Sequence, residues 1–165
     1  MLDQLSTHHL VPLLALAPLL VAVALSELRR LRIPNGYCLA AVALFAVAAA
    51  AGLAPDYALR IVVAASVLVL GFAAYCLKLF GGGDVKFMAV LLLFVPVESL
   101  QLYAFVFSAA MLAGIAAFLS LKRLPAAAAL NWRSMAPGRQ LPMGVPIALS
   151  GLMHPVAVMQ FSGAI

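Results

Sequence analysis

Charged residues are scarce in this chain. Only 9% of its 165 residues are charged, and 67% are hydrophobic. A soluble domain is roughly half apolar and about a quarter charged, so this composition excludes an ordinary soluble domain. The apolar stretches are continuous rather than alternating, which argues against a β-barrel with strands of about 10 residues. We therefore predict an all-α, polytopic integral membrane bundle, with a single domain over residues 1–165 and no separate soluble domain.

Cysteine is also rare, and the basic charge has a topological explanation. Cys38 and Cys76 lie in or beside apolar runs, which is typical of small buried side chains, and no Cys-x-x-Cys pair indicates a zinc site. The net charge of +5 does not indicate nucleic acid as a partner, because the cations fall in short loops between apolar runs. The first apolar run follows Asp3 without any Lys or Arg, so it is not typical of a secretory signal.

Six apolar runs approach the length of a spanning helix, which needs about 20 mostly apolar residues. They cover residues 10–26, 37–54, 59–77, 84–96, 100–121 and 145–165. The fourth run is short for a span. The sixth run contains His154-Pro155, and a proline inside a helix kinks or breaks it. The expected fold is thus a bundle of about six transmembrane helices.

The cations orient this bundle. With the loop after the first run placed in the cytoplasm, Arg60 alone falls outside, and nine cations fall inside: Arg29, Arg30, Arg32, Lys78, Lys86, Lys122, Arg123, Arg133 and Arg139. Cytoplasmic loops carry the excess of Lys and Arg in membrane proteins. Both termini are therefore expected outside the cytoplasm.

The same topology brings two acids to one membrane face. Glu27 ends the first run and Asp84 begins the fourth, both on the cytoplasmic side, whereas Asp3, Asp56 and Glu98 fall on the other side. Acids at membrane depth are costly and are rarely incidental. Asp84 also follows three glycines, which allow close approach of other backbone and which we expect to interrupt the helix.

Two neighbouring carboxyls suit peptide hydrolysis, which needs a base to activate water and an acid to protonate the leaving nitrogen. Two like charges at short range cannot both ionise, so the pair shares one proton. Structural explanations remain open beside this one. Glu27 could pair with Arg29 or Arg30, Asp84 could cap the fourth helix, and the glycine run could form a tight turn.

Three motifs together resemble a known family. They are Arg32-Ile33-Pro34-Asn35, Gly81-Gly82-Gly83-Asp84-Val85-Lys86 and Leu141-Pro142-Met143-Gly144-Val145-Pro146-Ile147-Ala148. In this order they resemble the type IV prepilin peptidases, which are intramembrane aspartyl proteases with a Gly-x-Gly-Asp motif. The size most resembles the short single-domain branch that serves Flp-type, or tight-adherence, pili.

The resemblance implies an activity and a location. The implied reaction is cleavage of prepilin leader peptides after a glycine, just before the pilin's apolar helix, at the cytoplasmic face of the inner membrane of a bacterium or an archaeon. It implies a prepilin and the lipid bilayer as partners, and neither a metal nor an organic cofactor. Longer members carry a cytoplasmic domain with paired cysteines that N-methylates the new terminus, and this chain has neither, so we expect cleavage without methylation.

The resemblance also assigns site residues. Asp84 takes the place of the family's second catalytic aspartate. Glu27 stands where the family has its first aspartate, six residues before the isoleucine of Ile-Pro-Asn. The extra methylene moves the carboxyl by roughly an ångström, and misplacement on this scale can cost about a hundredfold in rate. Residues expected to bind substrate or to support the site are Gly81, Gly82, Gly83, Lys86, Arg32, Pro34 and Asn35.

Three other functions are alternatives to prepilin cleavage. A transporter or channel would carry polar residues across the bilayer midplane, but the helix centres here are almost uniformly apolar. A non-catalytic or impaired pilus-assembly protein of the same fold is favoured only by Glu27. A protease for other substrates remains open because presenilin-like proteases also carry Gly-x-Gly-Asp, although the Ile-Pro-Asn and Leu-Pro-x-Gly elements favour prepilins.

Overall fold

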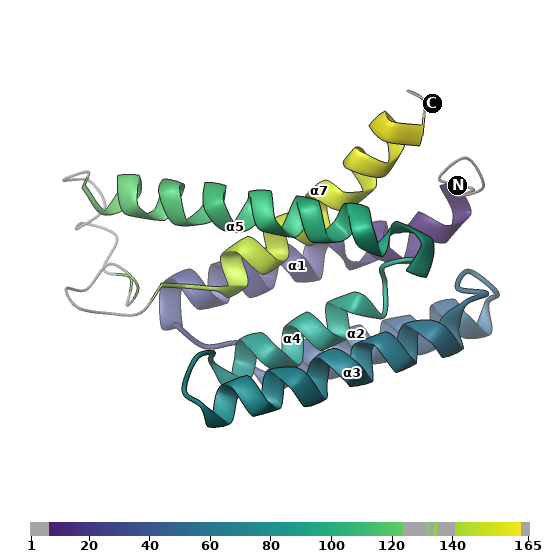
Figure 1. The fold of residues 1–165 in the computed structure, drawn as a ribbon, viewed down its shortest axis with the longest axis horizontal. Coiled ribbons are helices and arrows are strands. Elements are labelled where there is room, and N and C mark those ends of the chain that lie inside the picture. The colour runs from purple at the N-terminus through teal and green to yellow at the C-terminus, as the bar shows by residue number, and fades with distance from the viewer. Residues whose placement is uncertain (1–6, 124–131, 133, 135–140, 163–165) are drawn as a thin grey trace.

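The fold is an all-helical bundle, as expected from the sequence (Figure 1). The computed structural model describes residues 7–123, 132, 134 and 141–162, and these residues contain no strand. The 3-10 helices are η2 (Thr7–Leu10) and η3 (Val97–Ser99). The α-helices are α1 (Val11–Arg30), α2 (Asn35–Ala50), α3 (Tyr57–Cys76), α4 (Gly82–Leu92), α5 (Leu100–Lys122) and α7 (Gly144–Ser162).

Four of these helical segments are long and apolar enough to cross a membrane. They are Val11–Arg30, Tyr57–Cys76, Val97–Lys122 and Gly144–Phe161. The six α-helices of the described residues agree with the expected bundle of about six helices, and four of the helical segments meet this length criterion. Helix α2 has 16 residues and α4 has 11, so both fall short of the roughly 20 residues that a span requires.

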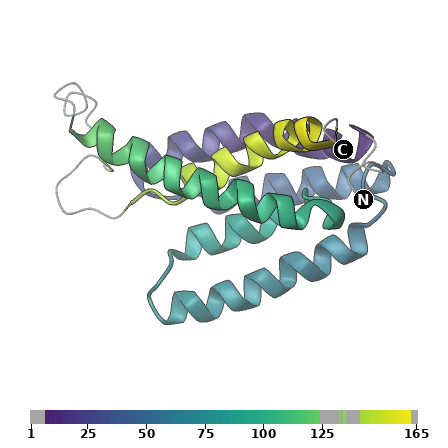
Figure 2. The same cartoon turned by 45° about the horizontal axis from the view of Figure 1, so that its top comes forward.

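The helices form two groups of three. Helix α7 packs against α1 and α5, while α3 packs along α4, and α4 also contacts α2 and α7 (Figures 1 and 2). Small residues allow the close approach of α7. A methyl group on Gly114 of α5 would lie 2.9 Å from Pro146, and one on Gly151 would lie 2.8 Å from Leu20 of α1. Such small residues let helices pack closely in lipid, where van der Waals contact holds them together.

Helix α4 ends inside the bundle, and the chain continues as buried non-helical backbone. Residues 93–96 are all buried. Backbone of this kind is tolerated at membrane depth only where protein satisfies its polar groups. Arg60, which is fully buried, donates to the Phe94 carbonyl at 3.3 Å and pairs with Asp56 at 2.6 Å, while the Val97 amide donates to Asp56 at 3.1 Å.

Loss of this buried cation is expected to destabilise the fold. Arg60→Met would leave Asp56 without its ion-pair partner and the Phe94 carbonyl without a donor. Breaking a buried pair costs about 3–5 kcal/mol. Thermal unfolding in detergent should show a clear decrease in stability, whereas Arg123→Met, at an exposed cation, should unfold like the parent. Equal unfolding of both variants would contradict this role for Arg60.

Helix boundaries differ from the expected ones at the points that matter for the site. Helix α1 continues to Arg30 rather than ending at residue 26, so Glu27 lies inside it. Helix α7 passes through Pro155 without a break, because a proline removes one backbone donor but leaves the rest of the helix intact. Its residues His154 and Ser150 are fully buried, which fits packing of this helix on both sides.

Candidate active site

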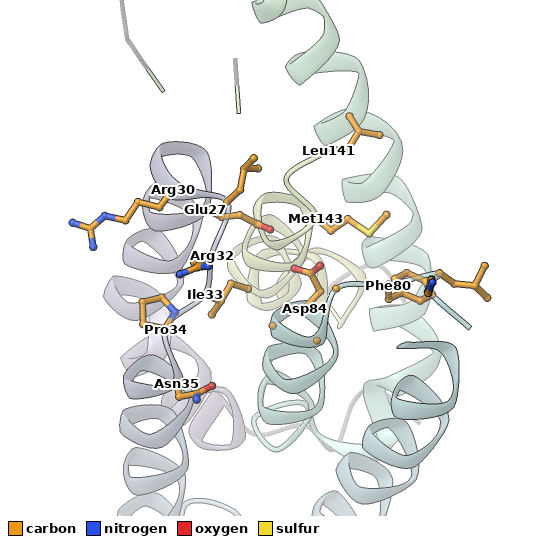
Figure 3. A pocket seen from close by; sticks show the side chains of 16 residues that line it. Glu27, Arg30, Arg32, Ile33, Pro34, Asn35, Phe80, Asp84, Leu141 and Met143 are labelled. Atoms are coloured by element: carbon orange, nitrogen blue, oxygen red, sulfur yellow. The ribbon is translucent and has the colours of Figure 1, made fainter. Parts of the chain in front are cut away.

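Three helix ends meet around one cleft of about 920 Å³ (Figure 3). They are the C-terminal end of α1 and the N-terminal ends of α4 and α7. The lining comprises Glu27, residues 30–35, residues 78–84, Leu141 and Met143. Segments that are more than a hundred residues apart in sequence thus form a single site.

The end of α1 shapes one wall of this cleft. Leu31 adopts a left-handed conformation with φ 53°, and its amide donates to the Glu27 carbonyl at 2.7 Å. The Ser26 hydroxyl donates to the Arg32 carbonyl at 3.0 Å and holds the following loop against the helix. Lys78, which also lines the cleft, is the other non-glycine residue with positive φ among the described residues. Such conformations are costly and tend to cluster at functional sites.

The glycine run is partly helical, contrary to expectation. Helix α4 begins at Gly82, with Gly81 as its N-cap residue, so Asp84 is the third residue of the helix rather than its cap. Its carboxylate instead reaches back to the Gly81 backbone amide, which is half of a capping box. The first turn of a helix tolerates glycine because its amides have no helical partners in any case. The run therefore starts a helix at the floor of the cleft.

Glu27 and Asp84 point toward each other across the cleft (Figure 3). Their carboxyl groups interact directly. The Glu27 side chain is only 6% exposed, although Arg30 beside it extends away from the site. Among the described residues, Glu27 forms no ion pair with Arg29 or Arg30. The geometry thus favours a carboxyl pair over the helix-end ion pair that the sequence also allowed.

Gly144 is a site residue that was not singled out from the sequence. It begins α7, and its backbone amide and that of Val145 lie beside the Glu27 carboxylate. A methyl group at this position would collide with the Glu27 carboxylate and would lie 3.0 Å from Ile33. Gly144 is part of the Leu-Pro-Met-Gly element. This motif indicated that the segment matters, but it did not indicate the contact between Gly144 and Glu27.

The environment of the two carboxyls suits a shared proton. Burial raises the pKa of the Asp84 carboxyl above its ordinary value, and its contacts with Glu27 and the Gly81 amide offset part of this rise. Asp84 therefore holds a proton to higher pH than an exposed aspartate does. The Oε2 atom of Glu27 is buried and makes no hydrogen bond within the described part of the chain. A buried carboxylate oxygen that makes no hydrogen bond is well suited to bind a water molecule or substrate.

Most of the other expected residues line the cleft, but Lys86 does not. Arg32, Pro34 and Asn35 form one wall with Ile33. Lys86 is exposed and lines a separate open pocket with Asn35, Gly36 and Cys38. The cations on the cleft itself are Arg30, Arg32 and Lys78. Lys86 thus lies on the wrong side of α4 to orient a substrate between the two carboxyls.

Two of the three glycines before Asp84, Gly81 and Gly82, are expected to differ in importance. A methyl group on Gly81 would lie 2.6 Å from Asp84 Oδ2, so Gly81→Ala must displace this carboxylate. A methyl group on Gly82 would meet the exposed Tyr75 ring at 3.4 Å, and this ring can move. We expect Gly81→Ala to reduce the peptide hydrolysis expected from the sequence at least tenfold and Gly82→Ala to reduce it less than threefold, on the scale of small misplacements. Equal rates for the two variants would contradict this assignment.

Comparison with protein families identifies the chain. The model of the type IV leader peptidase family matches residues 14–121, which include both Glu27 and Asp84. The chain belongs to the type IV leader peptidase family. Comparison with the curated proteins and with the solved structures gives no match.

Membership of the leader peptidase family supports a general function in prepilin processing, with a prepilin as substrate and a bilayer as environment. The family match ends before α7, so it does not include Gly144. The contact of α7 with Glu27 is seen in the structure and lies outside the family match.

Proposed function

We propose that this chain is an aspartic-type endopeptidase that removes the leader of Flp-type prepilins, with Glu27 and Asp84 as its catalytic dyad. The observation that carries the proposal is the meeting of these two carboxyls, from helices distant in sequence, in one cleft. Membership of the leader peptidase family supports it independently.

The chemistry follows from the pair. One carboxylate takes a proton from a water molecule, which attacks the scissile carbonyl, and the other carboxyl donates a proton to the leaving nitrogen. The pair must carry one proton between its members, because two adjacent carboxylates repel each other strongly. The two carboxyls titrate as a unit, so the proton is assigned to the dyad rather than to Glu27 or Asp84.

The position of the cleft supports processing at the cytoplasmic face. The cleft lies at the end of the bundle opposite η2 and the C-terminal end of α7 (Figure 1). Its rim carries Arg30, Arg32 and Lys78, as cytoplasmic ends of membrane helices commonly do. We propose an inner-membrane orientation with this cleft inside and both termini outside.

One experiment tests both proposals, that the substrate is a Flp-type prepilin and that the product is not methylated. Membranes that contain this chain would be mixed with a Flp-type prepilin, and the product would be analysed by mass spectrometry. We expect a new N-terminus after a glycine, just before the apolar helix, with no added methyl mass. Cleavage only of prepilins from other pilus classes would contradict the Flp assignment, and a methylated product would contradict cleavage without methylation.

A second candidate function is a catalytically impaired assembly protein, and only the presence of Glu27 in place of aspartate favours it. Glu27→Asp distinguishes the two in the same assay. If the parent cleaves at a rate within about a hundredfold of Glu27→Asp, the extra methylene is tolerated. If Glu27→Asp cleaves and the parent does not, this chain is impaired by Glu27.

A further inference from the structure

A second cavity begins at Asp84 and extends between the helices. It has a volume of about 380 Å³ and is lined by residues of α3, α4, α5 and α7. Its walls include Gly71 and Ala74 of α3, Met88 of α4, and Phe107 and Met111 of α5. We refer to it as the apolar groove, because Asp84 is the one charged residue among the described residues that line it.

The apolar groove and the cleft share a neck. Phe80, Asp84 and Met143 line both cavities, and Figure 3 shows Met143 and Phe80 on the side of Asp84 away from Arg30. The two cavities therefore meet at a carboxylate of the dyad. One carries cations on its rim, and the other is apolar.

The apolar groove also faces the bilayer. Helices α3 and α5 lie on different sides of α4 and diverge toward the end that carries the cleft (Figure 2). Helix α3 is largely exposed, with Leu70 at 70% and Phe72 at 62% exposure. Gly71 brings α3 against α4, since a methyl group there would lie 2.5 Å from Val85. A segment could therefore enter from the lipid along the wall that α3 forms.

Resting on the proposed function, we propose that the apolar groove binds the first residues of the prepilin's apolar helix, on the carboxyl side of the scissile bond. The leader then lies in the cleft with the cationic rim, and the scissile peptide crosses the neck at Asp84. A whole helix is about 10–12 Å wide with its side chains, so this volume accommodates apolar side chains of a helix seated over it. The two-part site matches a substrate that changes from polar to apolar at the cleavage point.

Photo-crosslinking tests this binding without cleavage. A benzophenone amino acid would replace Ala74 or Met111 in the Asp84→Asn background, and Ala73 or Leu112 in matched controls, which are exposed neighbours on the same helices. Each protein would be irradiated in membranes with an intact Flp-type prepilin. We expect adducts at the two groove positions, mapped to the start of the apolar helix, at least fivefold above the controls. Absence of adducts, or equal adducts at groove and control positions, would overturn the proposal.

Kinetics provide a second, separate test. Ala74→Phe fills the apolar groove and should raise KM for the full prepilin about tenfold, because it removes binding shared by ground state and transition state. Ala73→Phe should cleave like the parent, and a short peptide without the apolar helix should be cleaved equally by all three. Parental kinetics of Ala74→Phe on the full prepilin would overturn the inference while leaving the peptidase function intact. If the parent cleaves no prepilin, the peptidase function fails, and the crosslinking result still decides the groove.

Discussion

Asp84→Asn is expected to abolish leader cleavage, with a loss of at least a thousandfold. General acid–base catalysis by a positioned side chain contributes about 10²–10⁴-fold, and an amide can neither hold nor donate the proton that the dyad shares. Asparagine has nearly the same shape as aspartate, and its carbonyl oxygen can still accept from the Gly81 amide. The start of α4 should therefore be retained, and the effect should fall on chemistry.

The measurement is prepilin cleavage in membranes, with elution from a sizing column and helical content as checks on folding. Glu98→Gln is a matched control, because it also exchanges an acid for its amide, at an exposed position beyond α4 in the 3-10 helix that precedes α5. It should cleave like the parent. Cleavage by Asp84→Asn at more than a tenth of the parental rate would contradict a catalytic role for this carboxyl.

Gly144→Ala is expected to reduce cleavage about a hundredfold. The added methyl group would collide with the Glu27 carboxylate and lie 3.0 Å from both Glu27 Cδ and Ile33 Cδ1. The carboxylate must then leave its present position beside Asp84, and displacements near an ångström cost about this much in rate. Alanine itself favours the helical state, so the loss should not come from a weaker start of α7.

Two further variants separate this steric explanation from a general effect of alanine. Gly36→Ala adds a methyl group at the start of α2, where nothing lies within 4 Å, and should cleave like the parent. Combining Gly144→Ala with Glu27→Asp should recover part of the lost rate, because the shorter side chain withdraws from the added methyl group. A Gly144→Ala protein that cleaves at the parental rate would show that α7 does not position Glu27.

The placement of two helix ends at the candidate site could be predicted from local patterns. Continuous apolar runs predict helices, and the placement of cations predicts which helix ends share a membrane face. Together these two patterns predict that Glu27 and Asp84 lie at the same face of the membrane. The exact start of α4 could not be predicted in the same way, since Gly82 and Gly83 disfavour a helix by propensity and tertiary packing overrides this preference.

The position of Lys86 depends on where α4 begins, which the motif alone does not give. Lys86 follows Asp84 by two residues, and residues at this spacing point to different faces of a helix. Because α4 begins at Gly82, both are helical, and Lys86 points away from the cleft. The expected start of the fourth helix near Asp84 did not determine which face of the helix would carry Lys86.

Two other features depend on contacts between distant segments. Arg60 was assigned to the outer loop, yet it is fully buried because the backbone after α4 needs its hydrogen bonds. Gly144 meets Glu27 only once α7 has packed against α1. Neither contact can be predicted from spacing or hydrophobic pattern, because each depends on how distant segments pack against each other.

The most direct test of the dyad is a double-mutant cycle measured by prepilin cleavage in membranes. The variants are Glu27→Gln, Asp84→Asn and the combination of both. Residues that act as one catalytic unit are strongly non-additive, so each single variant should fall to the background rate and the double variant should fall no further. If Glu27→Gln instead retains activity close to that of the parent while Asp84→Asn does not, Glu27 is not a member of the catalytic pair and the central claim is wrong.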